Sequence, residues 1–257
     1  MSFIPFRTLF LSSLTVVTFL AAHSSAEAGT LVSVDLGTTT QSGFQQWNVG
    51  ADGTGLRTTT FTITDFVSVP GGLLTAYLGA GNDATNINND SGTINTRIRA
   101  NAPANSGSFT LTNLLNDRVV STTGAGTGLF LSLSGFAPST TFTIQVWGYD
   151  TQNSPATGAK PGTFTLYDRT AGANTSLGSF TTTAGQLPTD NNTFSVIGTV
   201  TSDANGVIVV ESISNMDGTG IMNGFVVSTV PEPAATSLAL CGIVTLAARR
   251  RRRPTAR

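Results

Sequence analysis

The sequence predicts an all-β fold, a single β-sandwich or jelly roll, between two apolar end segments. Short runs of alternating apolar and polar residues recur along the 257-residue chain, which is the period of half-buried strands. Thr and Gly are abundant, whereas the helix formers Glu and Lys are almost absent between the end segments. No long stretch there has the 3.6-residue period of an amphipathic helix.

The alternation is clearest in eight runs, which are predicted as strands. Turn-forming residues separate several of them, including Pro70-Gly71-Gly72, Lys160-Pro161-Gly162 and Asn205-Gly206. The predicted strands cover residues 31–36, 60–67, 129–134, 141–149, 163–168, 193–200, 206–213 and 221–228. The polar segment 82–91 is predicted as a long surface loop.

One strand shows how the faces are expected to divide. In residues 141–149, the aliphatic face holds Phe142, Ile144 and Val146, which are predicted to lie in the core. The opposite face is rich in Thr but ends in two aromatic residues, Trp147 and Tyr149.

The charges are unevenly distributed along the chain. The whole chain has 13 Lys and Arg against 14 Asp and Glu. Residues 29–230 hold six basic and twelve acidic residues, a net charge of −6, and neither His nor Cys. This composition excludes Ser-His-Asp and Cys-His nucleophiles, the usual zinc and copper sites, and a disulfide framework. Sparse positive charge also argues against nucleic acid as a partner.

Residues 1–28 have the three parts of a secretory signal peptide. Arg7 supplies the positive charge, residues 8–22 form the apolar run, and Ala26-Glu27-Ala28 fits the small-x-small cleavage rule. Cleavage after Ala28 would leave Gly29 as the new N-terminus. The alternative is an uncleaved anchor, but the run is shorter than the roughly twenty apolar residues of a spanning helix.

The C-terminal segment, residues 230–257, has three elements in a fixed order. Pro231-Glu232-Pro233 comes first, and the mostly apolar residues 234–248 follow. As a helix, that stretch would be about 22 Å long, so it could span a membrane only if its ends snorkel toward the interfaces. The positive-inside rule keeps the closing arginines cytoplasmic. They are Arg249, Arg250, Arg251, Arg252 and Arg253.

This segment resembles the PEP-CTERM sorting signal of Gram-negative bacteria. The resemblance implies that an exosortase, a transpeptidase-like membrane protease, recognises Pro231, Glu232 and Pro233. It also implies export through the inner membrane and removal of the tail, which delivers the protein to the envelope or an extracellular polymer matrix. A plain C-terminal anchor with a proline hinge is the alternative.

The exported domain, residues 29–229, more loosely resembles jelly-roll modules of the galactose-binding-like and carbohydrate-binding type. The matching residues are the run 32–37 with Gly43 and Trp47, the run 133–144, and Asp217-Gly218 followed by residues 223–226. The resemblance implies a jelly-roll fold. Fold analogy by itself is not evidence of sugar binding.

Sugar binding nevertheless has candidate residues. An aromatic ring can stack on the C–H face of a pyranose while neighbouring polar groups bond its hydroxyls. Trp147, Tyr149 and Tyr167 would share one face if the strands at 141–149 and 163–168 paired as a wide hairpin, and Trp47 is a second candidate. Packing in the core is the alternative for each ring.

An enzyme and a metal site are weaker hypotheses. Glycoside hydrolysis needs two carboxylates, and Glu211 with an Asp could supply them. Glu211 is either a buried acid with a raised pKa or, as we predict, a charge that protects an edge strand. A structural Ca²⁺ could bind the polar loops at 82–90, 52–53 or 215–217, although none has a known calcium-loop spacing. No other cofactor is expected.

The sequence therefore favours a non-enzymatic exported protein of the cell envelope or extracellular biofilm matrix. The first alternative is a carbohydrate-binding module for exopolysaccharide, and the second is a glycan-active enzyme. The expected partners are the exosortase, the membrane before processing, and exopolysaccharide or other matrix proteins.

Overall fold

The computed structural model describes residues 29–49, 58–64, 74–81, 93–98, 103, 107–121, 128–151, 158–216 and 219–230. All of them lie in one compact unit, Ala28–Pro231. Strands and turns make up this described part, and none of its segments forms a helix that could cross a membrane. The predicted signal peptide with Ala26 and Ala28, and the predicted sorting signal from Pro231 onward, lie outside the described residues.

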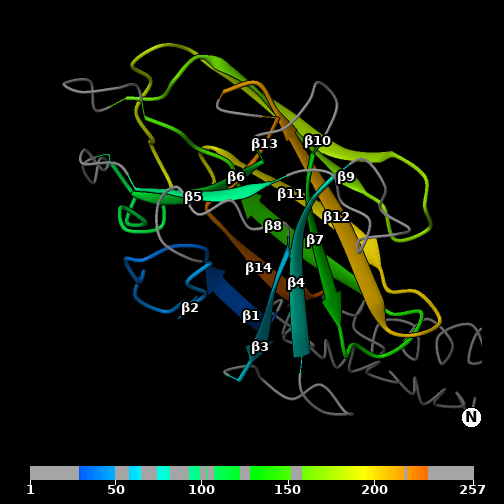
Figure 1. Ribbon diagram of the computed structural model, residues 1–257. Helices are drawn as coiled ribbons and strands as arrows, with labels where there is room; N and C mark the ends of the chain where they lie inside the picture. Colours follow the sequence, from blue (N-terminus) through cyan, green and yellow to red (C-terminus); the bar gives the residue numbers. More distant parts are fainter. Residues whose placement is uncertain are drawn as a thin grey trace, which may run out of the picture. The chain divides into compact units, whose positions relative to one another are not determined.

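Fourteen strands are present in the described residues (Figure 1). They are β1 Thr30–Asp35, β2 Gln45–Gln46, β3 Thr58–Ile63, β4 Leu74–Gly81, β5 Ile94–Ile98, β6 Asp117–Ser121, β7 Gly128–Ser134, β8 Thr141–Trp147, β9 Gly162–Asp168, β10 Thr175–Thr182, β11 Ser195–Thr201, β12 Val207–Ser214, β13 Gly220–Met222 and β14 Gly224–Thr229.

The strands form three sheets. The five-stranded sheet has the order β11-β8-β14-β1-β2, and the six-stranded sheet has the order β10-β9-β12-β7-β4-β3. A smaller sheet, β13-β6-β5, completes the set. The strand pairs are antiparallel except for β1 with β2. Because β14 pairs with β1, the first and last described strands lie side by side in the five-stranded sheet.

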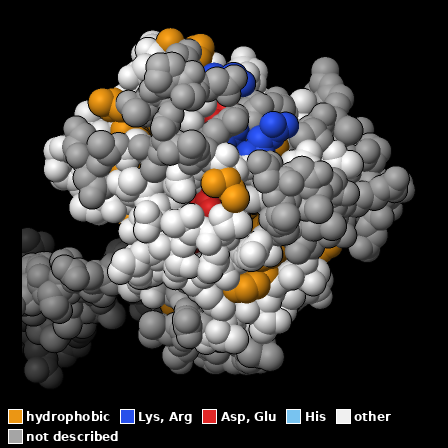
Figure 2. All heavy atoms as spheres, turned by 60° about the vertical axis from the view of Figure 1, so that its left-hand side comes forward, with side chains coloured by type: hydrophobic (Ala, Val, Ile, Leu, Met, Phe, Trp, Pro, Cys, Tyr) orange, Lys and Arg blue, Asp and Glu red, His pale blue; other side chains and the backbone are white. Residues whose placement is uncertain are grey.

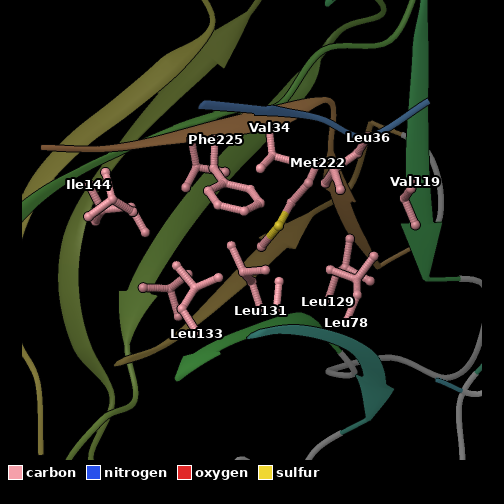
Figure 3. Close-up of a cluster of buried hydrophobic side chains, with 14 of the residues drawn as sticks. Val34, Leu36, Leu78, Val119, Leu129, Leu131, Leu133, Ile144, Met222 and Phe225 are labelled. Carbon is pink, nitrogen blue, oxygen red and sulfur yellow. The ribbon is translucent and has the colours of Figure 1, made fainter. Parts of the chain in front are cut away.

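The core lies between the two larger sheets. Figure 3 shows Val34, Ile144 and Phe225 of the five-stranded sheet facing Leu131 and Leu133 of the six-stranded sheet, and all five are fully buried. Alternation along each strand sends every second side chain into this layer. Burying an aliphatic side chain of this size contributes about 1.5–3 kcal/mol, so this layer is the main source of stability.

The predicted all-β class is confirmed for the described residues, and each of the eight predicted runs overlaps a strand. The predicted core face of residues 141–149 is also confirmed, since Phe142, Ile144 and Val146 are buried. The expectation of one sandwich was incomplete, because a third sheet is present. Of the predicted features, the loop at 82–91 lies outside the described residues.

Several strands were missed for identifiable reasons. Strand β6 opens with Asp117 and Arg118, a charged pair that is typical of a turn, yet all five of its residues are buried. Strand β10 is polar and mostly exposed at the edge of its sheet, so it lacks an apolar face to detect. In β4 the core face includes Ala76 and Ala80, which give only a weak hydrophobic signal.

The predicted turn at Asn205-Gly206 forms as expected. Asp203 Oδ1 accepts hydrogen bonds from the N–H groups of Asn205 and Val207, each at 2.8 Å. Gly206 has a φ of 74°, a left-handed conformation in which a Cβ would lie 2.0 Å from the carbonyl oxygen of Phe136. This turn joins β11 of the five-stranded sheet to β12 of the six-stranded sheet.

Candidate functional site

The outer face of the six-stranded sheet, the face turned away from the five-stranded sheet, carries a group of aromatic and charged side chains. Residues directly opposite each other on paired strands share a face. Glu211 of β12 is opposite Tyr167 of β9 on one side and Phe130 of β7 on the other. The neighbouring Val210 and Leu131 face the core, so Tyr167, Glu211 and Phe130 form a row on the outer face.

A second row lies two residues along the same strands. Tyr77 of β4 is opposite Ser132 of β7, which is opposite Val209 of β12. Tyr77 and Tyr167 are both half-buried. They are three strand spacings apart across the sheet, which is about 14 Å. The two tyrosine rings therefore lie on either side of Phe130, Ser132, Val209 and Glu211.

Glu211 pairs with Arg169 within this face. The Oε2 atom of Glu211 lies 2.9 Å from Nε of Arg169, and the two side chains are only 2% and 12% exposed. Arg169 also lies over the Phe130 ring, with its guanidinium carbon 5.6 Å from the ring centroid. Its backbone N–H donates to the carbonyl of Val209 at 2.8 Å, which fixes the chain beside β12 as β9 ends.

Burial raises the pKa of Glu211, and the positive charge of Arg169 opposes that rise, as does a hydrogen bond from the backbone of Gly128. Gly128 leaves the space that the carboxylate occupies, because a Cβ there would lie 2.4 Å from Oε1 of Glu211. Glu211 is therefore a buried acid held in place by one cation and one peptide group.

The prediction that Glu211 protects an edge strand is wrong. Strand β12 lies in the interior of the six-stranded sheet, between β9 and β7. Both neighbouring strands pair with the backbone of β12, so β12 has no free edge to protect. The apolar run around Glu211 is compatible with an edge strand and with a central strand. Only the pairing of β12 with β9 and β7 distinguishes the two.

The structure also corrects three of the four predicted sugar-binding aromatics. Trp147, Tyr149 and Trp47 are 2%, 0% and 2% exposed. Each ring packs against another ring: Trp147 edge-on against Phe44, Tyr149 against Phe194, and Trp47 stacked on Phe61. These rings fill the interior, and none of them offers a face to a ligand.

The predicted hairpin between residues 141–149 and 163–168 does not form. Strand β8 belongs to the five-stranded sheet and β9 to the six-stranded sheet. Trp147 donates from Nε1 to the carbonyl of Asn191 at 2.9 Å, and its ring contacts Phe44 in the interior. Tyr167 is therefore the predicted aromatic residue that is half-buried and not fully buried, and Tyr77 lies on the same face of the sheet. Tyr77 was missed because β4 was not predicted.

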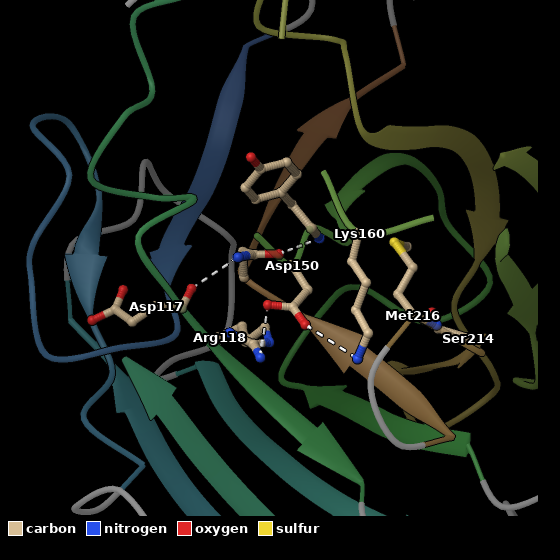
Figure 4. Close-up of polar contacts among 8 residues, drawn as sticks. Asp117, Arg118, Asp150, Lys160, Ser214 and Met216 are labelled. Carbon is tan, nitrogen blue, oxygen red and sulfur yellow. Dashed lines mark hydrogen bonds and ion pairs between the residues drawn. The ribbon is translucent and has the colours of Figure 1, made fainter. Parts of the chain in front are cut away.

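A second polar cluster lies inside the molecule (Figure 4). Arg118 Nη2 is 2.8 Å from Asp150 Oδ1, with both side chains almost fully buried, and Lys160 Nζ is 3.9 Å from Asp150 Oδ2. Asn223 donates from Nδ2 to the carbonyl of Asp117 and accepts the N–H of Tyr149 at Oδ1. This cluster joins β6 to the segments that follow β8 and precede β14.

Asp35 and Asp117 are both 0% exposed. Burial raises the pKa of Asp35 to about 8, an N–H donated by Gln41 opposes the rise, and the negative charge of Asp117 adds to it. The two carboxyl groups thus lie within electrostatic range of each other.

The loops predicted for calcium are largely not described: segments 52–53 and 82–90 fall outside the described residues, as does Asp217. Among the described residues, no group of three or more acidic, His or Cys side chains is placed to hold a metal ion.

Figure 2 shows one face of the molecule on which neutral polar side chains and backbone predominate among the described atoms. Lys and Arg side chains gather in a small area there, with a few hydrophobic side chains nearby. This neutral character agrees with the low charged fraction of the chain, 11%.

Comparisons with known proteins give distant structural likenesses. No family model matches the chain, and no curated protein matches it. Endo-1,4-β-D-xylanase 10B of Clostridium thermocellum, its CBM22-1 and GH10 modules in complex with xylohexaose, is 10% identical over 56% of this chain and 25% of that chain, with a TM-score of 0.33. This chain therefore matches only a quarter of the xylanase structure.

Two further structures are similar at a comparable level. The carbohydrate-binding module CBM6cm-2 of Cellvibrio mixtus lichenase 5A, in complex with cellotriose, is 19% identical over 52% of this chain and 96% of that module, with a TM-score of 0.25. The enzymatically active domain of tailspike protein 4 from bacteriophage CBA120 is 8% identical over 67% of this chain and 18% of that chain, with a TM-score of 0.19. The β-sandwich-like fold thus has a distant similarity to carbohydrate-binding modules.

Proposed function

We propose that this chain is a non-catalytic exported protein of the cell envelope or extracellular matrix, and that it binds polysaccharide through the outer face of its six-stranded sheet. One observation carries the proposal. Tyr77 and Tyr167 lie half-buried on the same face, about 14 Å apart across the sheet and two residues apart along it, with Phe130 and the Glu211–Arg169 ion pair largely buried between them.

This arrangement suits a sugar chain. A half-buried Tyr offers one ring face and a hydroxyl group, which match the C–H face and the rim hydroxyls of a pyranose. The span between the two rings, about 14 Å across the sheet, matches the length of several sugar units. Thr165, opposite Ile213 on the same face, adds a further hydroxyl group beside Tyr167.

The same face gives little support to catalysis. Glu211 is the one glutamate of the exported domain, and its Oε2 atom is engaged by Arg169. A general acid must be within reach of the substrate, and the side chain of Glu211 is only 2% exposed. We therefore propose that Glu211 and Arg169 fix the shape and the charge distribution of the outer face of the six-stranded sheet.

Binding is tested by affinity electrophoresis of the chain in gels that contain hydroxyethylcellulose, xylan or alginate. Tyr167→Ala and Tyr77→Ala should each weaken retardation in the gel that binds by about tenfold, the value of one aromatic stacking contact. Ile197→Ala is the matched control, because Ile197 is an exposed apolar side chain, 49% exposed, on the five-stranded sheet. Equal retardation of wild type and both tyrosine variants would reject the site.

Delivery to the matrix forms the second part of the proposal. We assign it to the segment from Pro231 to the arginine cluster, with Glu232 as the residue read by the exosortase. Glu232→Ala should leave the tail uncleaved and hold the protein in the membrane fraction, as followed by immunoblotting of membrane and culture medium. Unchanged release of the variant would reject sorting by this motif, while the polysaccharide proposal would stand.

A further inference from the structure

Two buried carboxylates accept hydrogen bonds from the loop between β1 and β2. Asp35 is the last residue of β1 and Asp117 is the first of β6. Oδ2 of Asp117 accepts the backbone N–H groups of Thr38 and Thr39, at 2.5 and 2.9 Å. Oδ2 of Asp35 accepts the N–H of Gln41 at 2.7 Å. One oxygen of each carboxylate thus holds the loop.

The second oxygen of each carboxylate has no such partner. Oδ1 of Asp35 and Oδ1 of Asp117 are both buried and accept no hydrogen bond from any described residue. A buried carboxylate oxygen without a donor costs several kcal/mol, and native proteins normally satisfy it with a hydrogen bond, water or an ion.

The guanidinium group of Arg118 does not pair with either of these carboxylates. Arg118 directly follows Asp117, but its guanidinium pairs with Asp150 at 2.8 Å. Figure 4 shows the side chains of Asp117 and Arg118 pointing in different directions. Asn223 donates to the backbone carbonyl of Asp117 and not to its carboxylate. No described Lys or Arg side chain thus forms an ion pair with Asp35 or Asp117.

The backbone of the loop approaches these carboxylates closely. A Cβ on Gly37 would lie 2.2 Å from Oδ1 of Asp117, so only glycine leaves room for the carboxylate at this position. Oxygen ligands from two carboxylates, with further ligands from peptide carbonyls or water, are what hard divalent cations such as Ca²⁺ prefer.

We propose that Oδ1 of Asp35 and Oδ1 of Asp117 bind one hard divalent cation of the Ca²⁺ class, which ties the β1–β2 loop to β6. Two carboxylates balance the charge of one such ion. A site with two protein carboxylates has the modest affinity of extracellular calcium modules, with a Kd of about 10⁻⁴–10⁻³ M.

The test uses the full chain, stripped of metal with EDTA, and follows thermal unfolding with added CaCl₂. At about 5 mM CaCl₂ the wild-type Tm should rise by about 3–5 °C. Asp35→Asn and Asp117→Asn should lose this rise. Asp190→Asn is the control and should keep it, because Asp190 is an exposed residue of the loop before β11.

A direct measurement of calcium binding tests the site even if the variants fold poorly. Calcium titration calorimetry of the wild type should give one site per chain, and Asp35→Asn should weaken it at least tenfold. The proposal is overturned if CaCl₂ shifts neither the Tm nor the heat signal. In that case the wild-type Tm is expected to fall between about pH 5 and 9, and the Tm of Asp35→Asn is not. That result would mean that the two carboxyl groups share a proton instead of a cation.

Discussion

Glu211 Oε2 lies 2.9 Å from Arg169 Nε on the outer face of the six-stranded sheet, with the Phe130 ring beneath the guanidinium. A buried ion pair is an uncommon feature for an outer face, where solvent normally screens charge. The pair fixes Arg169 across the end of β9 and over β12 and β7. It thereby gives the region between Tyr77 and Tyr167 one defined shape.

Removing Arg169 should destabilise the protein more than its position near the surface indicates. Arg169→Ala leaves Glu211 buried without its cation, which typically costs about 3–5 kcal/mol. Urea unfolding of Arg169→Ala and of the double variant Arg169→Ala with Glu211→Gln measures the effect. The double variant should recover part of the loss, and additive losses would show that the two side chains are not coupled.

The pH dependence of stability should report on Glu211. Its pKa is raised in the folded protein, so the folded state holds a proton that the unfolded state has released. This contribution to stability is therefore complete below the unfolded value of about 4.5 and is lost as the pH rises above it. Urea unfolding between about pH 4 and 8 should show a steeper decline in wild type than in Glu211→Gln, which keeps only the decline that the raised pKa of Asp35 causes.

Gly128→Ala should disturb the ion pair between Glu211 and Arg169. A Cβ at this position would lie 2.4 Å from Oε1 of Glu211, so the carboxylate must move or β7 must shift, at a cost of about 1–3 kcal/mol. Gly29→Ala is the control, because its Cβ would have only an ordinary contact of 3.6 Å with Thr229. A loss of equal size in both variants would point to backbone effects instead of the contact with Glu211.

The fold class and most core strands could be predicted because they depend on local alternation. Phe142, Ile144 and Val146 all face the core as expected. The role of Trp147 could not be predicted in this way, since alternation tells which face a side chain takes but not whether a second cluster covers that face. Trp147 and Tyr149 lie in a separate apolar cluster with Phe109 and Phe194.

The candidate site depended even more on pairing between distant strands. Tyr167 could be identified from its own strand, but its neighbours Glu211 and Phe130 are set by the order β9-β12-β7. That order is a property of the whole sheet, and no local pattern encodes it. The orphaned oxygens of Asp35 and Asp117 are likewise visible only once β1 and β6 are brought together.

The last prediction concerns Asn223, which lies between β13 and β14. Its Oδ1 accepts the N–H of Tyr149 at 2.6 Å, its Nδ2 donates to the carbonyl of Asp117 at 2.8 Å, and its backbone carbonyl accepts the N–H of Leu36. Because Asn223 is 0% exposed, Asn223→Ala would leave two buried backbone groups unpaired, at about 1–3 kcal/mol each.

Asn223→Asp separates the two hydrogen bonds of that side chain. The aspartate keeps an acceptor for Tyr149 but loses the donor to Asp117 and adds a buried negative charge near Asp117, so it should be at least as destabilising as Asn223→Ala near neutral pH. Its stability should rise as the pH falls and the new carboxyl group is protonated. Urea unfolding at about pH 4.5 and pH 7.5 measures this difference, and an Asn223→Asp variant as stable as wild type at both pH values would show that the donor to Asp117 does not stabilise the fold.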